Sequence, residues 1–502
     1  MSVNGSLTLQ LQPRTLAGSA MPIASQSFPR EEQNPEGVCS SGTRALPPER
    51  VDSAGEVRGA PTRLSLRSNF AWALAGNVGY AACQWGMIVV LAKLGNTFLV
   101  GQFSLGVAIA TPVLMFTNLH LRAMQATDAQ RQYGFFEYRR LRIATTLAAM
   151  AVIAIVAGWG DHDRRAMPVI LAVAAAKSME ALSDIYYGLF QLNDRLDQIG
   201  QSMILRGLAS LAALSIAFYL TRDLFWGCFG MAVVSLGSLL FFDCRPRDYL
   251  PRPETRSRIS IRSRLLNGPV RTAAFRRQWG LIWTALPLGI MTTLVSINLN
   301  MPRYFIHARL GEHQLGIFSA LAYATVAVTL VSDSLSNCAI PRMSRLYAGE
   351  RIAEFRSFLL AMLGLTSVLG VAGLVAAKLM GARLLAIVYG PEYAAHARVF
   401  TLLMLAPAIQ CVASGFTSGI MSARRFRIQA TMSALMVGAN AVACALWIPV
   451  AGLEGGAMAM VVAAVVRLVL AAAVAGRLVW SPSKAGAGSP APAWNAGEPS
   501  YD

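Results

Sequence analysis

The stretch KSMEALSDIYYGLFQ, residues 177–191, carries the residues best placed to do chemistry. On a helix, at about 100° per residue, five of its polar side chains fall within an arc of about 80°. They are Lys177, Glu180, Asp184, Tyr187 and Gln191. An ammonium group beside two carboxylates suits two kinds of chemistry. The lysine can bind an anion, and the acids can neutralise the lysine or take up a coupling proton or sodium ion.

This polar stripe lies at membrane depth. It continues the apolar run AMPVILAVAAA at residues 166–176. At a rise of ~1.5 Å per residue, Lys177 is ~15 Å from Met167, near the middle of a bilayer core that is ~30 Å thick. A charge facing lipid there costs at least ~2.5–3.5 kcal/mol. We therefore expect the stripe to face a polar cavity or partners on other helices. An internal network that only joins two helices is the alternative.

The composition is that of an integral membrane protein and excludes several function classes. The 502 residues are 55% hydrophobic and 14% charged, whereas soluble domains carry about 25% charged residues. The net charge of +18 comes from arginines in alternate loops, as the positive-inside rule requires, so no nucleic-acid partner is expected. The seven cysteines and five histidines show no metal-ligand spacing, and Walker, GxSxG and HExxH motifs are absent from the sequence. We expect no catalytic residue, metal or cofactor.

Hydropathy divides the chain into twelve predicted transmembrane helices, an all-α architecture. They cover about residues 69–92, 97–119, 143–160, 167–191, 202–221, 224–243, 280–302, 314–338, 356–378, 395–420, 428–449 and 454–476. These form two sets of six, in residues 67–243 and 280–478, joined by an arginine-rich cytoplasmic linker at residues 244–279. Residues 1–66 and 479–502 are low in complexity, and we expect both to be disordered and cytoplasmic. Arginine-rich loops alternate with arginine-poor loops along the chain, and this distribution predicts that both termini are inside the cell.

Both halves carry a matching corner between their first two helices. The first reads Lys93-Leu94-Gly95 followed by GQFS at 101–104, and the second reads Arg309-Leu310-Gly311 followed by GIFS at 316–319. The same position in both halves indicates an internal repeat. Six spans per half keep the two halves in the same orientation, which suits a transporter whose halves rock about a central cavity.

Further polar residues are candidates for binding a cargo. Arg206 is expected near the cytoplasmic mouth, or else to extend to the membrane interface. Asn300 and Arg303 flank Pro302 at the expected outer end of the seventh span, where Asn can bind sugar hydroxyls; an ordinary loop arginine beside a helix-ending proline is equally compatible. Arg467 lies ~20 Å into the last span and is assigned to a cavity rather than the interface.

The chain resembles the bacterial polysaccharide flippases (Wzx-like) of the multidrug/oligosaccharidyl-lipid/polysaccharide (MOP) exporter superfamily. The resemblance rests on several segments distributed over roughly residues 69–476. They are GQFSLGVAIATPV at 101–113, LRAMQATDAQRQYGF at 121–135, the 177–191 stretch, NMPRYFI at 300–306, LGIFSAL at 315–321, YGPEYA at 389–394 and MSARRFRIQ at 421–429.

The resemblance implies two six-helix lobes around a central V-shaped cavity in the bacterial inner membrane. It also implies export of a lipid-linked oligosaccharide, carried on undecaprenyl diphosphate, to the outer leaflet for O-antigen, exopolysaccharide or capsule synthesis. A polysaccharide polymerase and glycosyltransferases are then the expected protein partners. Two alternatives remain open: a cation-coupled drug antiporter of the same superfamily, and a non-transporting scaffold of a polysaccharide-synthesis complex.

Overall fold

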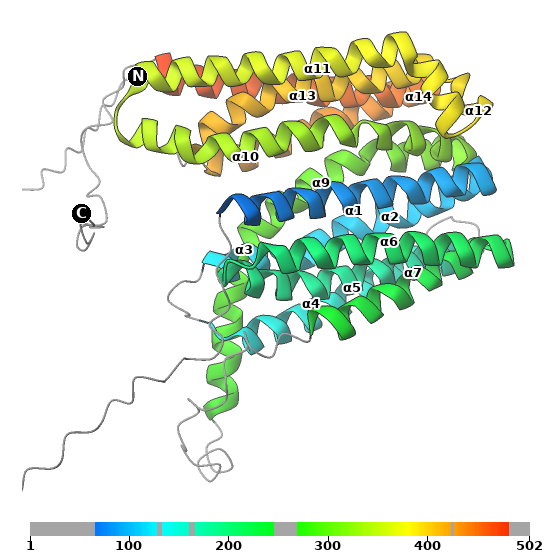
Figure 1. Cartoon of the computed structure of the whole chain (residues 1–502), viewed down its shortest axis with the longest axis horizontal. Coiled ribbons are helices and arrows are strands. Elements are labelled where there is room, and N and C mark those ends of the chain that lie inside the picture. Colours follow the sequence, from blue (N-terminus) through cyan, green and yellow to red (C-terminus); the bar gives the residue numbers. More distant parts are fainter. Residues whose placement is uncertain (1–65, 128–132, 160–165, 245–268, 423–425, 481–502) are drawn as a thin grey trace, which may run out of the picture. The chain divides into compact units, whose positions relative to one another are not determined.

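The computed structural model describes residues 66–127, 133–159, 166–244, 269–422 and 426–480. Every regular element in these ranges is helical (Figure 1). The first half contains α1 (Leu66–Leu94), α2 (Thr97–Asn118), α3 (Leu121–Thr127), α4 (Phe135–Trp159), α5 (Ala166–Leu192), α6 (Leu196–Thr221), α7 (Leu224–Ser238) and the π-helix η1 (Leu239–Asp243). The second half contains α9 (Pro269–Ala324), α10 (Val326–Ala348), α11 (Ile352–Val388), α12 (Pro391–Ala394), α13 (Ala397–Ser422) and α14 (Phe426–Trp480).

The described residues contain ten helical stretches that are long and apolar enough to cross a membrane. The two longest, Gln278–Ala348 and Ile428–Arg477, are each broken by a glycine with a positive φ angle: Gly311 at 82° and Gly452 at 58°. Left-handed backbone of this kind favours glycine, which has no Cβ to clash. Divided at these glycines, the stretches give twelve spans, the number predicted from hydropathy.

Several predicted helix ends are wrong because the helices continue past the apolar core. α4 begins at Phe135 rather than near residue 143, and α9 begins at Pro269, inside the predicted linker. α9 also runs through Pro302 to the break at Gly311, so Arg303 is within a helix and not in an outer loop. Hydropathy detects only the part of a helix that lies in lipid, whereas backbone hydrogen bonding continues beyond it. The predicted disordered segments, 1–66 and 479–502, lie almost entirely outside the described residues.

The described residues form one unit, in which contacts are concentrated within each half of the chain. α5 packs against α2, α4 and α7, and α6 against α1 and α7; in the second half, α13 packs against α10, α11 and α14. Contact between the halves is made mainly by α2 and α9 (Figure 1). This arrangement agrees with the two predicted lobes.

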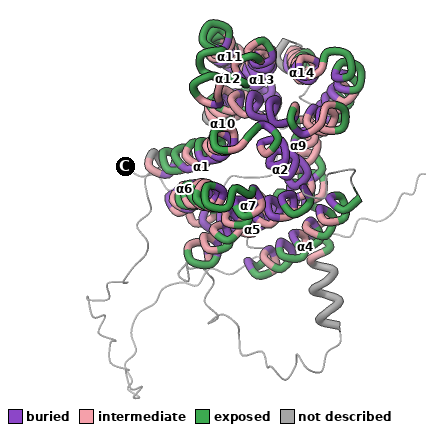
Figure 2. The backbone as a smooth tube through the Cα atoms, turned by 90° about the vertical axis from the view of Figure 1, so that its right-hand side faces the viewer, coloured by how far each residue is buried: buried purple, intermediate pink, exposed green. Residues whose placement is uncertain are grey.

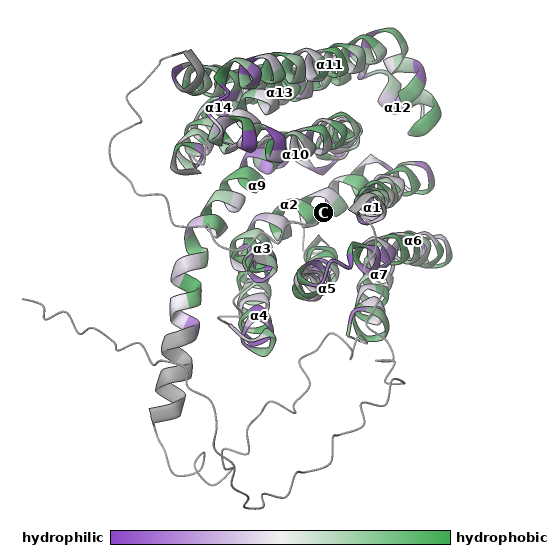
Figure 3. Ribbon diagram, turned by 60° about the vertical axis from the view of Figure 1, so that its left-hand side comes forward, coloured by the Kyte–Doolittle hydropathy of each residue, from purple (hydrophilic) through white to green (hydrophobic). Residues whose placement is uncertain are grey.

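Large apolar side chains are exposed on the outer faces, as expected for a protein surrounded by lipid. Leu220, Leu379, Ile387 and Val450 each expose more than two thirds of their surface. In Figure 2 the buried colour concentrates on α2 and α13, while α4 and α11 are largely exposed. In Figure 3 α5 and α10 carry hydrophilic stretches, whereas hydrophobic colour predominates on α11. The polar groups are therefore on inner helices, where they can line a cavity.

The two matching corners of the repeat contact each other. A Cβ added to Gly101 would lie 1.9 Å from the carbonyl oxygen of Glu312, and one added to Gly316 would lie 1.8 Å from the carbonyl oxygen of Thr97. Thr97 precedes Gly101 by four residues, and Glu312 precedes Gly316 by four residues. Each motif therefore contacts the other through equivalent positions. Phe103 and Phe318, also equivalent in the two motifs, are both buried in one hydrophobic core. This reciprocity supports the internal repeat.

Candidate functional site

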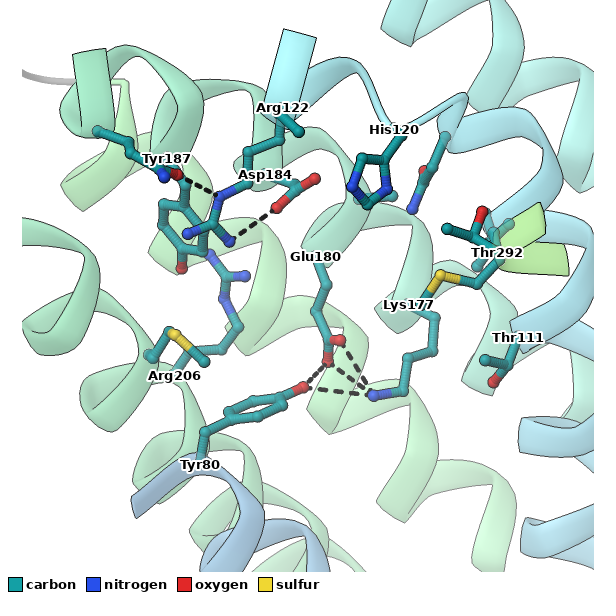
Figure 4. Close-up of a pocket in the computed structure, with 17 residues that line it drawn as sticks. Tyr80, Thr111, His120, Arg122, Lys177, Glu180, Asp184, Tyr187, Arg206 and Thr292 are labelled. Atoms are coloured by element: carbon teal, nitrogen blue, oxygen red, sulfur yellow. Dashed lines mark hydrogen bonds and ion pairs between the residues drawn. The ribbon is translucent and has the colours of Figure 1, made fainter. Parts of the chain in front are cut away.

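A cavity of about 570 Å³ is lined mostly by helices of the first half, and α5 supplies one wall of it (Figure 4). All five residues of the predicted polar stripe line the cavity. They are joined by residues from α1, α2, α3, α6 and α9 and from the turn between α2 and α3, including Tyr80, Thr111, Asn118, His120, Arg122, Arg206 and Thr292. The helical spacing of the stripe therefore places its charged groups at an internal cavity instead of at lipid.

Lys177 is paired with Glu180 in this cavity. The Nζ atom of Lys177 lies 3.0 Å from Oε2 and 3.2 Å from Oε1 of Glu180, and 3.3 Å from the hydroxyl of Tyr80. The Tyr80 hydroxyl donates a short hydrogen bond to Glu180 and accepts one of 2.9 Å from Gln84. The side chains of Lys177 and Glu180 are 18% and 22% exposed. Lys177 and Glu180 therefore form an ion pair at the cavity wall.

Asp184 does not contact Lys177 but bridges two arginines. Its Oδ2 lies 2.8 Å from Nη2 of Arg142, and its Oδ1 lies 3.2 Å from Nη1 of Arg122. Arg142 also donates to the backbone carbonyl and to the side-chain oxygen of Asn118, at 3.0 Å and 2.5 Å. The charge stripe on α5 is therefore divided into two separate ion-pair clusters.

Arg206 lines the cavity and forms a buried ion pair with Asp243. Its Nη2 lies 2.6 Å from Oδ2 of Asp243, the last residue of η1, and 2.5 Å from the hydroxyl of Ser183. Ser202 links Asp243 to the hydroxyl of Tyr187, at 2.6 Å and 2.8 Å. Arg206 and Asp243 are both buried, so Arg206 does not extend to the membrane interface. π-helical turns are rare and are frequent at functional sites.

The second-lobe candidates lie outside this cavity. Arg303 donates a 2.7 Å hydrogen bond from Nη1 to Oδ1 of Asn300, and neither residue lines the cavity wall. Arg467 lines a separate cavity of about 40 Å³ with residues of α9, α13 and α14.

The sequence did not single out Tyr80, Arg122, Arg142 and Asp243 as site residues. Arg122 and Arg142 were counted among the loop arginines that the positive-inside rule explains, and the late predicted start of the third span left Arg142 outside it. Asp243 could have been identified from the sequence, because it is a single acidic residue at the end of an apolar run, LGSLLFFD. Such an acid requires a buried base as its partner, and Arg206 supplies it.

Near the end of α2 remote from Asn118, the two halves of the chain contact each other through polar side chains. The hydroxyl of Thr97 lies 2.6 Å from Nδ1 of His313, and Trp85 donates a 2.6 Å hydrogen bond from Nε1 to the hydroxyl of Tyr389. Tyr389 in turn donates to the carbonyl oxygen of Ala320, at 2.9 Å. Asn118 and His120 line the cavity, whereas the contact between Thr97 and His313 lies at the other end of α2, about 30 Å away for a helix of this length.

The chain is similar to known membrane transporters. No protein-family model matches it. The capsular polysaccharide biosynthesis protein CapF of Staphylococcus aureus is 25% identical over 406 residues, which are 80% of this chain and 97% of CapF. An inward-facing multidrug resistance MATE family transporter of the MOP superfamily matches with a TM-score of 0.63 at 12% identity, over 81% of this chain and 96% of that chain. The lipid II flippase MurJ, in an inward closed conformation, matches with a TM-score of 0.60 at 9% identity, over 81% of this chain and 87% of the MurJ chain.

These comparisons confirm the resemblance seen in the sequence. The protein is a multi-pass membrane protein with the fold of MOP superfamily transporters.

Proposed function

We propose that this membrane protein flips a polyprenyl-diphosphate-linked oligosaccharide from the inner to the outer leaflet of the bacterial inner membrane, for polysaccharide synthesis. The observation that carries the proposal is the cavity of about 570 Å³, with lysine and arginine side chains in its wall at membrane depth. The similarity to CapF over nearly its whole length supports the link to capsular polysaccharide, and the MurJ match supports a fold suited to a lipid-linked cargo.

The cavity suits an anionic, hydrated head group better than an apolar drug. A diphosphate cannot cross the bilayer core without partners for its charge, whereas a polyprenyl tail is compatible with lipid. Lys177 and Arg122 offer cationic donors in the wall, and Asn118 and Thr292 offer neutral ones. We assign phosphate binding to Lys177, assign to the buried, ion-paired Arg206 only a contribution to the electrostatics of the wall, and assign Asn300, Arg303 and Arg467 to a later part of the path of the sugar.

Transport then proceeds by alternating access. With both termini in the cytoplasm, as the arginine distribution predicts, the Asn118 end of α2 faces the cytoplasm and the Thr97 end faces outward. The contacts of Thr97, His313, Trp85 and Tyr389 hold the outward end closed while the head group enters from the inner leaflet. Glu180, which is bonded to both Lys177 and Tyr80, is the proposed site of a coupling ion.

The antiporter alternative is less well supported by the cavity. Binding of a drug cation requires a carboxylate that is free of basic partners. Both acidic side chains lining the cavity, Glu180 and Asp184, are paired with bases. A scaffold that transports nothing has no use for a charged cavity at membrane depth.

Gene deletion tests the proposal directly. Loss of the protein should cause lipid-linked repeat units to accumulate in the inner leaflet, and the surface polysaccharide should disappear. Both changes should be reversed by the gene supplied in trans. Normal surface polysaccharide together with increased sensitivity to cationic drugs would instead establish the antiporter.

A further inference from the structure

Asp184 is held by two arginines that differ sharply in exposure. The Arg142 side chain is fully buried, whereas that of Arg122 is 34% exposed and lines the cavity. In Figure 4 Arg122 and Asp184 lie close together in the cavity wall, and an ion pair joins them. The two arginines therefore differ in how easily they can exchange their partner.

Arg142 is fixed in place. It makes a 2.8 Å bond to Asp184 and two bonds to Asn118, and a buried charge that loses its partner is strongly destabilised. Arg122 is held more weakly, because its bond to Asp184 is 3.2 Å long and its Nε lies 3.4 Å from the side-chain oxygen of Gln191. Partly exposed pairs of this kind contribute little stability. A ligand can thus compete for Arg122 without disturbing Arg142.

Arg122 is also positioned to accept a phosphate. Its guanidinium lies 5.4 Å from the centroid of the Tyr187 ring, which supports one face of the planar group. The planar fork of an arginine binds carboxylate and phosphate with the same two-donor geometry. Asp184 therefore occupies a position on Arg122 that suits a phosphate oxygen.

We propose that Arg122 is a phosphate-binding residue of the cavity and that Asp184 is its resident anion, which an incoming phosphate or diphosphate displaces while Arg142 retains it. The inference rests on the proposed function for the origin of the ligand, and it makes Asp184 a residue that acts through Arg122 instead of a coupling-ion site. When the phosphate leaves, the carboxylate reoccupies Arg122 and favours release.

The test measures the Kd of inorganic pyrophosphate for the full-length protein in lipid nanodiscs. Arg122→Ala should weaken binding about tenfold or more, as expected for loss of charge-assisted hydrogen bonds. Asp184→Asn should tighten binding several-fold, because it removes the competing anion. In the Arg122→Ala background, Asp184→Asn should change the Kd little, since the acid acts through Arg122. Equal tightening in both backgrounds, or none in either, would overturn the proposal.

Two further variants keep the test interpretable. Asp184→Asn leaves Arg142 without its carboxylate, so the combination Arg142→Gln with Asp184→Asn removes both partners and should bind pyrophosphate as tightly as Asp184→Asn alone. Arg351→Ala is the matched control, because Arg351 also pairs with a carboxylate, Glu354, but lies outside the cavity. It should leave the Kd unchanged, and an effect equal to that of Arg122→Ala would refute a specific site.

A second series uses undecaprenyl diphosphate incorporated in the nanodiscs. If the lipid binds more tightly than pyrophosphate and both depend on Arg122, the phosphate belongs to a lipid head group. If pyrophosphate binds as tightly, the site accepts a free anion. Arg122-dependent binding in a protein whose deletion leaves polysaccharide export intact would refute the proposed function and not this site. Export that is unaffected by Arg122→Ala, with unchanged Kd, would refute the site alone.

Discussion

At the scale of single residues, the face of α5 could be predicted and its partners could not. Helical periodicity places Lys177, Glu180 and Asp184 on one side, and all three line the cavity. Periodicity carries no information on which distant helix faces that side. Tyr80 on α1 and Arg142 on α4 became partners only in the folded chain. A test of Lys177 therefore has to vary Glu180 and not Asp184, because Asp184 is paired with Arg122 and Arg142.

The prediction for Lys177 uses a double variant. If Lys177 binds phosphate, Lys177→Met should nearly abolish export, Lys177→Arg should retain part of it, and adding Glu180→Gln should not restore it. If Lys177 only neutralises Glu180, the single change leaves a carboxylate unpaired, at a cost of up to a few kcal/mol, and the double change should recover both stability and export. Export is measured at matched protein levels in the membrane.

Restored export in the Lys177→Met, Glu180→Gln protein would therefore show that Lys177 is a structural counter-ion. Lys378→Met is a suitable control, since Lys378 lies on α11, away from the cavity.

At the scale of elements, the number of spans and the corner at Gly311 could be predicted, whereas helix lengths could not. α11 has 37 residues, about 55 Å, and a hydrophobic core of ~30 Å accounts for little more than half of it. The short helices α3 and α12 do not form separate apolar runs in the sequence. α3 nevertheless places Arg122 at the cavity, so part of the site depends on a helix that hydropathy does not predict as a separate element.

The reciprocal glycine contact predicts a conformational effect. Gly101→Ala or Gly316→Ala places a Cβ within 2 Å of a backbone oxygen and should destabilise the closed outward end by about 1–3 kcal/mol. In a cysteine-free background, disulfide formation between Thr97→Cys and His313→Cys should then decrease. Gly364→Ala is the control, because no atom lies within 4 Å of its added Cβ, and a free helical position gains about 0.5–1 kcal/mol from alanine.

Unchanged disulfide formation in the Gly101→Ala and Gly316→Ala proteins would show that the added methyl groups do not separate Thr97 from His313. The close approach of Gly101 and Gly316 would then not be required to keep the outward end closed.

At the scale of the whole molecule, the arginine asymmetry predicts the orientation. Ten arginines lie between Arg245 and Arg277, and positive loops remain in the cytoplasm. A cytoplasmic reporter fused within residues 244–279, or after Trp480, should be active, and a periplasmic reporter at these positions should be silent. Periplasmic activity at both positions would reverse the proposed direction of transport. The fold alone does not fix this orientation, because the positive-inside bias is a property of the loops.

The contact between Gly101 and Gly316 is that of a two-fold symmetric dimer enclosed in one polypeptide. Each side offers the same glycine and the same backbone segment to the other, as in an isologous subunit interface. A chain of six spans begins and ends on the same side of the membrane, so two such chains would insert in parallel and present these surfaces to each other. If the two halves of this protein were expressed as separate polypeptides, divided within residues 245–268, they would be expected to associate through these surfaces. In the intact chain the linker would then fix the one-to-one stoichiometry of the halves.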